Sequence, residues 1–138
     1  MKLLIDTNVI LDFALKREPF CEAAIAILDL ASECDYIECV SSSAITDIYY
    51  TARKVLGNEQ TQDSIRNLLV IIDSLSVTKE DILMALDLKW NDFEDAVQYA
   101  VAIHNNVDFI ISRDDKGFKN SVIPVYKPAE FLELVKDM

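Results

Sequence analysis

Six aspartates in four separate segments are the residues of this sequence best suited to do chemistry. They are Asp6, Asp47, Asp92, Asp95, Asp114 and Asp115. Taken singly, each is also explained as a turn residue or as an acid in the first turn of a helix. If they gather, carboxylates about 4 Å apart repel by roughly 4 kcal/mol at an effective dielectric of about 20. Such a cluster takes up protons or requires a cation, and an all-oxygen site suits Mg²⁺ or Mn²⁺.

A divalent cation held by acids would polarise a phosphodiester, activate a water molecule and stabilise the leaving oxygen. The sequence offers little for other chemistries. It has a single histidine, His104, which we expect to be structural or exposed near a helix end, and no Gly-rich phosphate loop or dinucleotide fingerprint. Two glycines in the whole chain are too few to build either loop. The residues therefore favour metal-dependent phosphoester hydrolysis.

Apolar runs that read as strands alternate with amphipathic stretches that read as helices. We expect strands at 2–6, 36–40, 74–77, 108–112 and 123–125, and helices at 19–33, 44–56, 59–72, 79–86, 92–105 and from Pro128 onwards. This alternation predicts an α/β fold of three layers, with a parallel sheet between helices. Ligands of such sheets bind outside the carboxyl ends of the strands, and all four acid-bearing segments are predicted to lie there.

Composition limits the class of protein. The chain has 138 residues, which suits one domain over 1–138, and 51% of them are hydrophobic. No uncharged apolar run is long enough to span a membrane, and no signal peptide is recognised. Cys21, Cys34 and Cys39 lack a metal-binding spacing. We therefore expect a cytoplasmic protein with reduced thiols. The net charge of −11 argues against a passive nucleic-acid-binding module. It suits a basic protein partner.

Three segments resemble the PIN domain family. They are LIDTNVILDFALKREPF, NDFEDAVQYAVAIHNNVDFIISRDDKGF and the C-terminal KNSVIPVYKPAEFL, which together run along essentially the whole chain. The resemblance implies a PIN-like α/β/α fold with strand order 3-2-1-4-5 and a metal-dependent ribonuclease site. Small single-domain PIN proteins of prokaryotes resemble VapC-like toxins, so it also implies a homodimer and an inhibitory antitoxin.

The same resemblance assigns the catalytic acids. Asp6 matches the first acid of the family, Asp95 the third and Asp114 the fourth, and these three are the expected metal ligands. Asp47 falls where the family commonly has glutamate, so its shorter side chain is expected to reach the metal through water.

Further positions match residues that support the acids. Asn8 follows the first acid, Asp92 and Asp115 add carboxylates beside the others, and Ser112 stands where threonine is usual and is expected to hold a metal-bound water. The sequence also departs from the family, because related turns often carry an acid just before the phenylalanine, where this chain has Gly117.

Basic residues near the acids are candidate contacts for substrate phosphates, with solvated surface as an equally good explanation. Arg113 and Lys116 lie within the acid-bearing turn; the others are Lys16, Arg17, Arg53, Lys54 and Lys119.

The acids and the family resemblance together imply hydrolysis of RNA with Mg²⁺ or Mn²⁺, and the resemblance implies the role of the toxin in a toxin–antitoxin pair with a basic antitoxin. Two alternatives stay open. One is a catalytically weak PIN domain that acts as a binding or scaffold protein, and the other is a phosphoesterase that uses the same acids on small phosphates. A receiver-like protein would need paired acids near the first strand, and residues 1–6 carry only Asp6.

Overall fold

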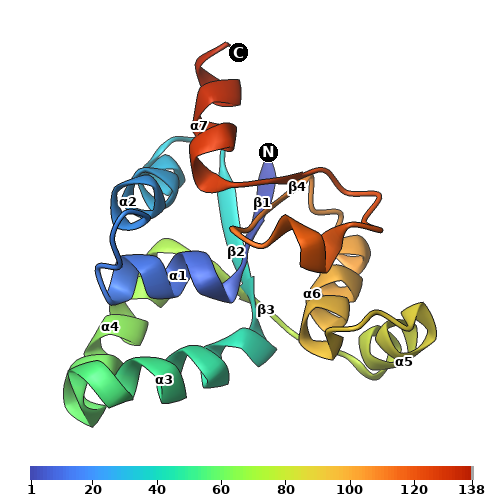
Figure 1. Cartoon of the computed structure of the whole chain (residues 1–138), viewed down its shortest axis with the longest axis horizontal. Helices are drawn as coiled ribbons and strands as arrows, with labels where there is room; N and C mark the ends of the chain where they lie inside the picture. Colours follow the sequence, from blue (N-terminus) through green and yellow to red (C-terminus); the bar gives the residue numbers. More distant parts are fainter. Residues whose placement is uncertain (138) are drawn as a thin grey trace.

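The centre of the fold is a parallel sheet of five short strands. The computed structural model describes residues 1–137, apart from the side chain of Asp115. The strands are β1 (Lys2–Ile5), β2 (Ile37–Ser41), β3 (Asp73–Leu75), β4 (Phe109–Ile111) and β5 (Val125–Tyr126), in the order β3-β2-β1-β4-β5 (Figure 1). All four strand pairs are parallel. The expected strand order is confirmed.

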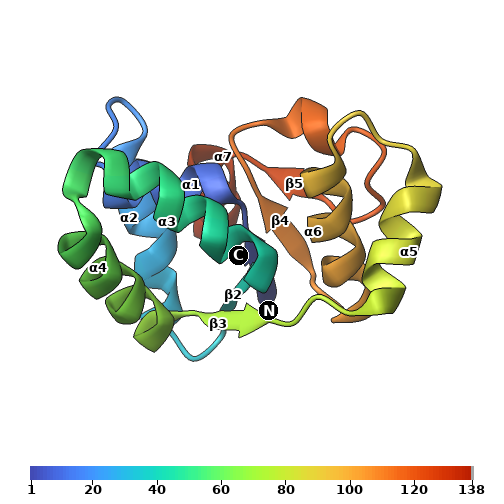
Figure 2. The same cartoon turned by 90° about the horizontal axis from the view of Figure 1, so that it is seen from below.

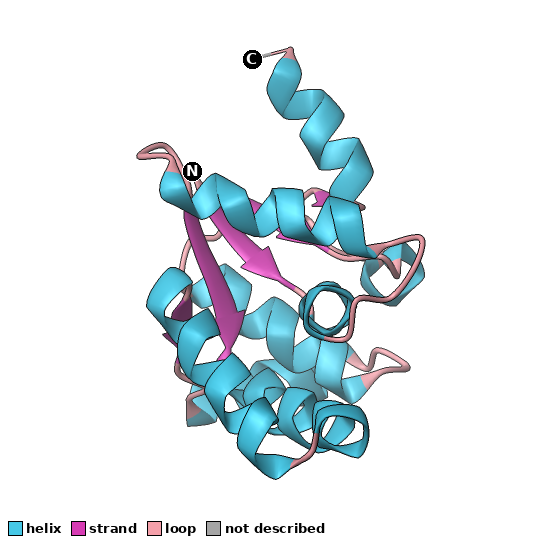
Figure 3. Ribbon diagram, turned by 90° about the vertical axis from the view of Figure 1, so that its left-hand side faces the viewer, coloured by secondary structure: helices cyan, strands magenta, loops and turns pink. Residues whose placement is uncertain are grey.

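Helices cover both faces of the sheet, which confirms the three-layer prediction (Figures 2 and 3). One face carries α1 (Thr7–Ala14), α2 (Cys21–Asp29), α3 (Ser42–Leu56), α4 (Asn58–Ile71) and α7 (Pro128–Lys136), and the other carries α5 (Lys79–Leu88) and α6 (Phe93–His104). Two short 3-10 helices are η1 (Leu30–Ser32) and η2 (Asp115–Phe118). Along β1, Leu3 and Ile5 pack into the first layer and Leu4 into the second, as the two-residue period of a strand requires. No helix within residues 1–137 is long and apolar enough to cross a bilayer.

Local sequence signals set several helix ends. Gly57 ends α3 with a φ of +79°, a backbone conformation that residues with a Cβ rarely adopt. Thr78 caps α5 in a capping box with Asp81. Asp81 also contacts His104, and this pair links α5 to the end of α6, which is the structural role expected for the histidine.

The structure corrects three expectations about local structure. Asp6, Thr7 and Asn8 do not form a simple turn: Asp6 caps α1, and its side chain accepts a hydrogen bond from the Thr7 amide. Pro19 precedes α2 rather than lying in its first turn. Phe93, an apolar residue of the helix expected at 92–105, is the first residue of α6 and is 46% exposed rather than buried in the core.

Glu38 is an unusual member of the core. It lies in β2 opposite Leu3 and is 2% exposed, and neither carboxylate oxygen has a hydrogen-bond partner within the described residues. Burial, with the charge of Asp29 as a smaller cause, raises the pKa of Glu38 from its ordinary 4.5 to about 8. The side chain is therefore protonated at neutral pH.

We expect Glu38→Gln to become more stable than the wild type as pH rises. The raised pKa means that the folded state retains a proton that the unfolded chain loses, so wild-type stability falls as pH rises from 4.5 to about 8. The relative gain of the variant is about 1.4 kcal/mol per pH unit in this window. Urea denaturation at several pH values measures it, with exposed Glu33→Gln as control. Parallel stability profiles for wild type and Glu38→Gln would contradict the prediction.

Candidate active site

The acids expected from the sequence gather in one cleft at the carboxyl ends of the strands. The cleft has a volume of about 400 Å³, and six of the expected site residues line it: Asp6, Asn8, Asp47, Asp92, Asp95 and Asp114. Their neighbours in its wall are Thr7, Leu11, Arg17, Thr51 and Glu94. The Asp115 side chain lies outside the described residues, and Ser112 is buried directly beneath the acids. Segments far apart in sequence thus bring their carboxylates together, as the topology predicted.

Asp6 is held in place by three hydrogen bonds from three different elements. Its Oδ1 accepts from the Thr7 amide at 2.8 Å and from Gln98 Nε2 at 3.0 Å. Its Oδ2 accepts from Ser112 Oγ at 2.7 Å, and Ser112 Oγ in turn accepts from the Asp114 amide at 3.0 Å. With 3% exposure, Asp6 is a fixed, oriented oxygen donor rather than a mobile surface acid.

Asp92 and Asp95 place further oxygens at the start of α6. Asp92 caps the helix by accepting a hydrogen bond from the Asp95 amide at 3.1 Å, while the Asp95 carboxylate, in a residue 9% exposed, faces the cleft. Gly117 lies directly against this carboxylate. A Cβ at residue 117 would fall 2.1 Å from Asp95 Oδ2 and 3.5 Å from Asp114 Oδ2. The acid that related turns carry at this place therefore has no room here, and Asp114 occupies the adjacent space.

Glu94 is a further acid that sequence reasoning missed. Its Oε1 accepts a hydrogen bond from Thr7 Oγ1 at 3.3 Å, and its carboxyl faces Asp47, which is exposed in the second turn of α3. The available signal was its position between Asp92 and Asp95, because all three residues of a first helical turn lie near the same end of the helix. Asp47 and Glu94 thus extend the acidic lining of the cleft to α3.

Crowding of the acids perturbs their protonation. Burial, followed by the charges of Asp6, Asp92 and Asp114, raises the pKa of Asp95 to about 7. Burial also raises the pKa of Asp6, although its hydrogen bonds partly oppose this. Glu94 has its pKa raised to about 7 by burial and then by Asp47. Asp95 and Glu94 therefore bind protons near neutral pH, which is the condition that a bound cation relieves.

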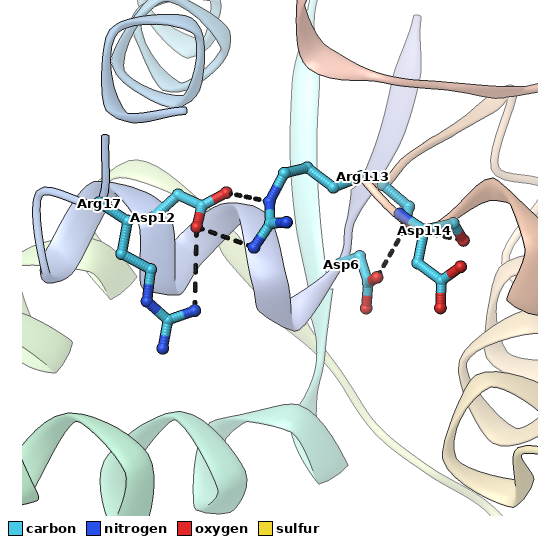
Figure 4. Close-up of polar contacts among 6 residues, drawn as sticks. Asp6, Asp12, Arg17, Arg113 and Asp114 are labelled. Carbon is cyan, nitrogen blue, oxygen red and sulfur yellow. Dashed lines mark hydrogen bonds and ion pairs between the residues drawn. The ribbon is translucent and has the colours of Figure 1, made fainter. Parts of the chain in front are cut away.

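Arg113 attaches the acid-bearing turn to α1 (Figure 4). Its Nε donates to Asp12 Oδ2 at 2.6 Å and its second guanidinium nitrogen to Asp12 Oδ1 at 3.2 Å, while the guanidinium stacks on Phe20 at 4.0 Å from the ring centre. Arg17 approaches the same buried carboxylate at 3.8 Å. The guanidinium group of Arg113 is thus already occupied by Asp12. The structure therefore does not support the expected phosphate contact of Arg113 and gives this side chain a positioning role instead.

Comparison with known proteins decides the family. A sequence profile of the PIN domain matches residues 2–116. The chain is also 34% identical to "Ribonuclease VapC1" of Aquifex aeolicus (strain VF5), in an alignment that covers 96% of this chain and 94% of that protein. This chain belongs to the PIN domain family.

Solved structures confirm the fold of this PIN domain. VapBC2 from Rickettsia felis, bound to a DNA fragment from its promoter, matches with a TM-score of 0.73 at 18% identity, over 92% of this chain and 98% of that one. Mycobacterium tuberculosis VapC20, a toxin that cleaves the sarcin–ricin loop, matches with a TM-score of 0.71 at 13% identity, over 86% of this chain and 94% of the other. At these identities the likeness is one of fold.

The donor set of this PIN domain fits a hard divalent cation, because every acid that lines the cleft offers oxygen. Within residues 1–137, leaving aside the Asp115 side chain, no three acidic, histidine or cysteine side chains are already arranged closely enough to enclose an ion. Asp6, Asp95 and Asp114 are the three that border one another, since the pKa of Asp95 responds to both of the others.

Proposed function

We propose that this protein is an endoribonuclease that requires Mg²⁺ or Mn²⁺. The observation that carries the proposal is the convergence of acids from four segments in one cleft, with Asp6 fixed by three hydrogen bonds. The 34% identical relative named as a ribonuclease supports RNA as the substrate. The acids alone would equally serve a small phosphoester, so the relative is what favours RNA over the phosphoesterase alternative.

Each residue has a defined task in this proposal. Asp6, Asp95 and Asp114 would hold the cation, which supplies charge for the phosphodiester and its leaving oxygen and makes a water molecule more acidic. Ser112 and Gln98 orient Asp6 by donating hydrogen bonds to its two oxygens. Arg113 holds the turn that carries Asp114 against α1 through Asp12. Asp47 and Glu94 extend the oxygen-lined wall along the substrate.

Cleavage of a single-stranded RNA oligonucleotide by the purified chain tests the proposal. We expect cleavage within the strand in millimolar Mg²⁺ or Mn²⁺, complete loss with EDTA, and recovery when metal is restored. Single-stranded DNA and a small aryl phosphate serve as comparison substrates. Hydrolysis of the aryl phosphate alone would support the phosphoesterase instead, and no hydrolysis with any metal would leave a PIN domain that binds without cutting.

We also propose that a basic antitoxin inhibits this chain. Structures of similar fold include a toxin–antitoxin complex from Klebsiella pneumoniae, and the net charge of −11 suits a partner with Lys or Arg that enters the acid cleft. Co-expression with the small reading frame beside its gene, followed by pull-down and the RNA assay, is expected to give an inactive complex. An active or partnerless protein would contradict this. The homodimer and the cytoplasmic location stay predictions of the family resemblance.

A further inference from the structure

A second cleft lies beside the acid cleft and shares part of its wall. It has a volume of about 270 Å³ and is formed by the α5–α6 connection and the segment from Asp114 to Asn120. Asp92, Asp95 and Asp114 line both clefts, whereas the other walls come from different elements, α1 and α3 in the acid cleft and the two connections in this one. The acids therefore form the boundary between two hollows.

The second cleft carries lysines beside the three aspartates that it shares with the first. Lys89, Lys116 and Lys119 line it, all three are exposed, and the amides of Asn91 and Asn120 lie among them. The whole chain has only 13 lysines and arginines against 24 acids, so a hollow in which three lysines balance three aspartates is less acidic than the chain as a whole. We call this hollow the lysine cleft.

The walls of the lysine cleft are tied together from beneath. Trp90, next to Lys89, packs against Tyr99 of α6 at 4.7 Å between ring centres, and against Phe118 of η2 at 6.1 Å. This packing holds the α5–α6 connection and η2 at a fixed separation. Lys89 lies on the connection, and Lys116 of η2 and Lys119 at its C-terminal end lie on the other wall of the cleft. The indole is engaged in this packing, so recognition in the cleft rests on ammonium groups and amides.

We propose that the lysine cleft binds the RNA phosphates that flank the scissile bond. The inference rests on the proposed ribonuclease function and says where the RNA strand continues beyond the acid cleft. An RNA strand that is cut at Asp95 must pass the neighbouring acids, whose negative charge repels its phosphates. Binding of polyphosphates depends on lysine and arginine. On the side of α1, Arg113 is engaged by Asp12 and Arg17 lies near it, so the lysine cleft holds the largest group of basic side chains that borders the acids.

Salt-dependent binding of RNA, measured by fluorescence anisotropy, tests the lysine cleft. An Asp6→Asn background prevents cleavage, and Asp6 does not line this cleft. The variant is Lys89→Gln, Lys116→Gln and Lys119→Gln together, and the matched control is Arg66→Gln, Lys79→Gln and Lys136→Gln, three exposed basic residues outside both clefts. Loss of three phosphate contacts is expected to lower the slope of log affinity against log salt by about 2, because single strands lose roughly 0.7 per contact.

The second measurement is RNA cleavage, with the same lysine substitutions made in a chain that keeps Asp6. The cleft variant should raise KM for a long oligonucleotide at least about tenfold and lose the preference for a long strand over a dinucleotide, while the control keeps both. If the wild type cuts RNA but the cleft variant shows an unchanged salt slope and KM, the lysines only offset the charge of the acids and the inference is overturned. Failure of the wild type to cut RNA would instead count against the proposed function, and the anisotropy slope still decides whether the cleft binds RNA.

Discussion

Asp95→Asn and Asp6→Asn are expected to abolish both metal binding and RNA cleavage without destabilising the fold. Each substitution keeps the shape of the side chain and removes one of the three charges that border one another. Loss of several kcal/mol of charge stabilisation lowers the cleavage rate by at least about a hundredfold. In the wild type, metal at a hundred times its Kd adds about 2.7 kcal/mol to the free energy of unfolding. Neither variant should show this gain.

Thermal melts separate this expectation from simple damage. Without metal, both variants should melt at or above the wild-type temperature, because burial, followed by the neighbouring charges, raises the pKa of Asp95 to about 7, and a neutral amide removes both costs. Asp73→Asn, an exposed aspartate at the amino end of β3, is the control and should keep both the metal-induced shift and the activity. A metal-induced shift in Asp95→Asn equal to that of the wild type would remove Asp95 from the ligand set.

Gly117→Ala is expected to lower cleavage by about a hundredfold while leaving stability close to that of the wild type. The new methyl group would lie 2.1 Å from Asp95 Oδ2, so the two cannot keep their present positions. The obstructed atom is the end of a side chain, which rotates away at little cost to the fold. A displacement of about 1 Å at a reacting centre is enough for a loss of this size.

Gly57→Ala is the control, with the opposite expected effects on stability and activity. No atom lies within 4 Å of a Cβ built at residue 57, but the backbone there has a φ of +79° that disfavours any side chain. This variant should lose about 1 kcal/mol of stability and retain full activity. Measured kcat, metal affinity and urea midpoints for the two variants therefore should show opposite patterns. Equal activity in Gly117→Ala and the wild type would mean that the Asp95 position seen here is not the productive one.

The fold was largely predictable because its signals are local and repeated. Short apolar runs separated by amphipathic stretches indicated the number of strands and their positions along the chain, and caps such as Thr78 and Gly57 gave helix ends within a residue or two. The strand order within the sheet came from the family resemblance. The α1 helix was missed because its first residues, Thr7 and Asn8, favour turns, and because Asp6 was assigned a chemical role without its capping role. An N-cap and a catalytic acid carry the same sequence signature.

The site was predictable only as a set of acids, not as a geometry. Strand topology placed Asp6, Asp95 and Asp114 at one edge, and the structure brings them there. Nothing local in the sequence indicated that Arg113 would turn toward Asp12, since that pair joins residues 101 positions apart. Gln98 was hidden for the same reason, although a polar residue three positions after Asp95 within a buried helix face was a usable sign.

The three donors to Asp6 also determine when the protein becomes active during its own synthesis. Gln98 follows Asp6 by 92 residues and Ser112 follows it by 106. Asp6 therefore cannot be fully oriented until most of the chain has been synthesised. Until residue 112 has left the ribosome, β4 cannot complete its pairing with β1 and the carboxylate lacks the hydrogen bond from Ser112. Long-range closure of this kind comes late in folding. A chain that ends before residue 112 therefore lacks the oriented carboxylate that the proposed site requires.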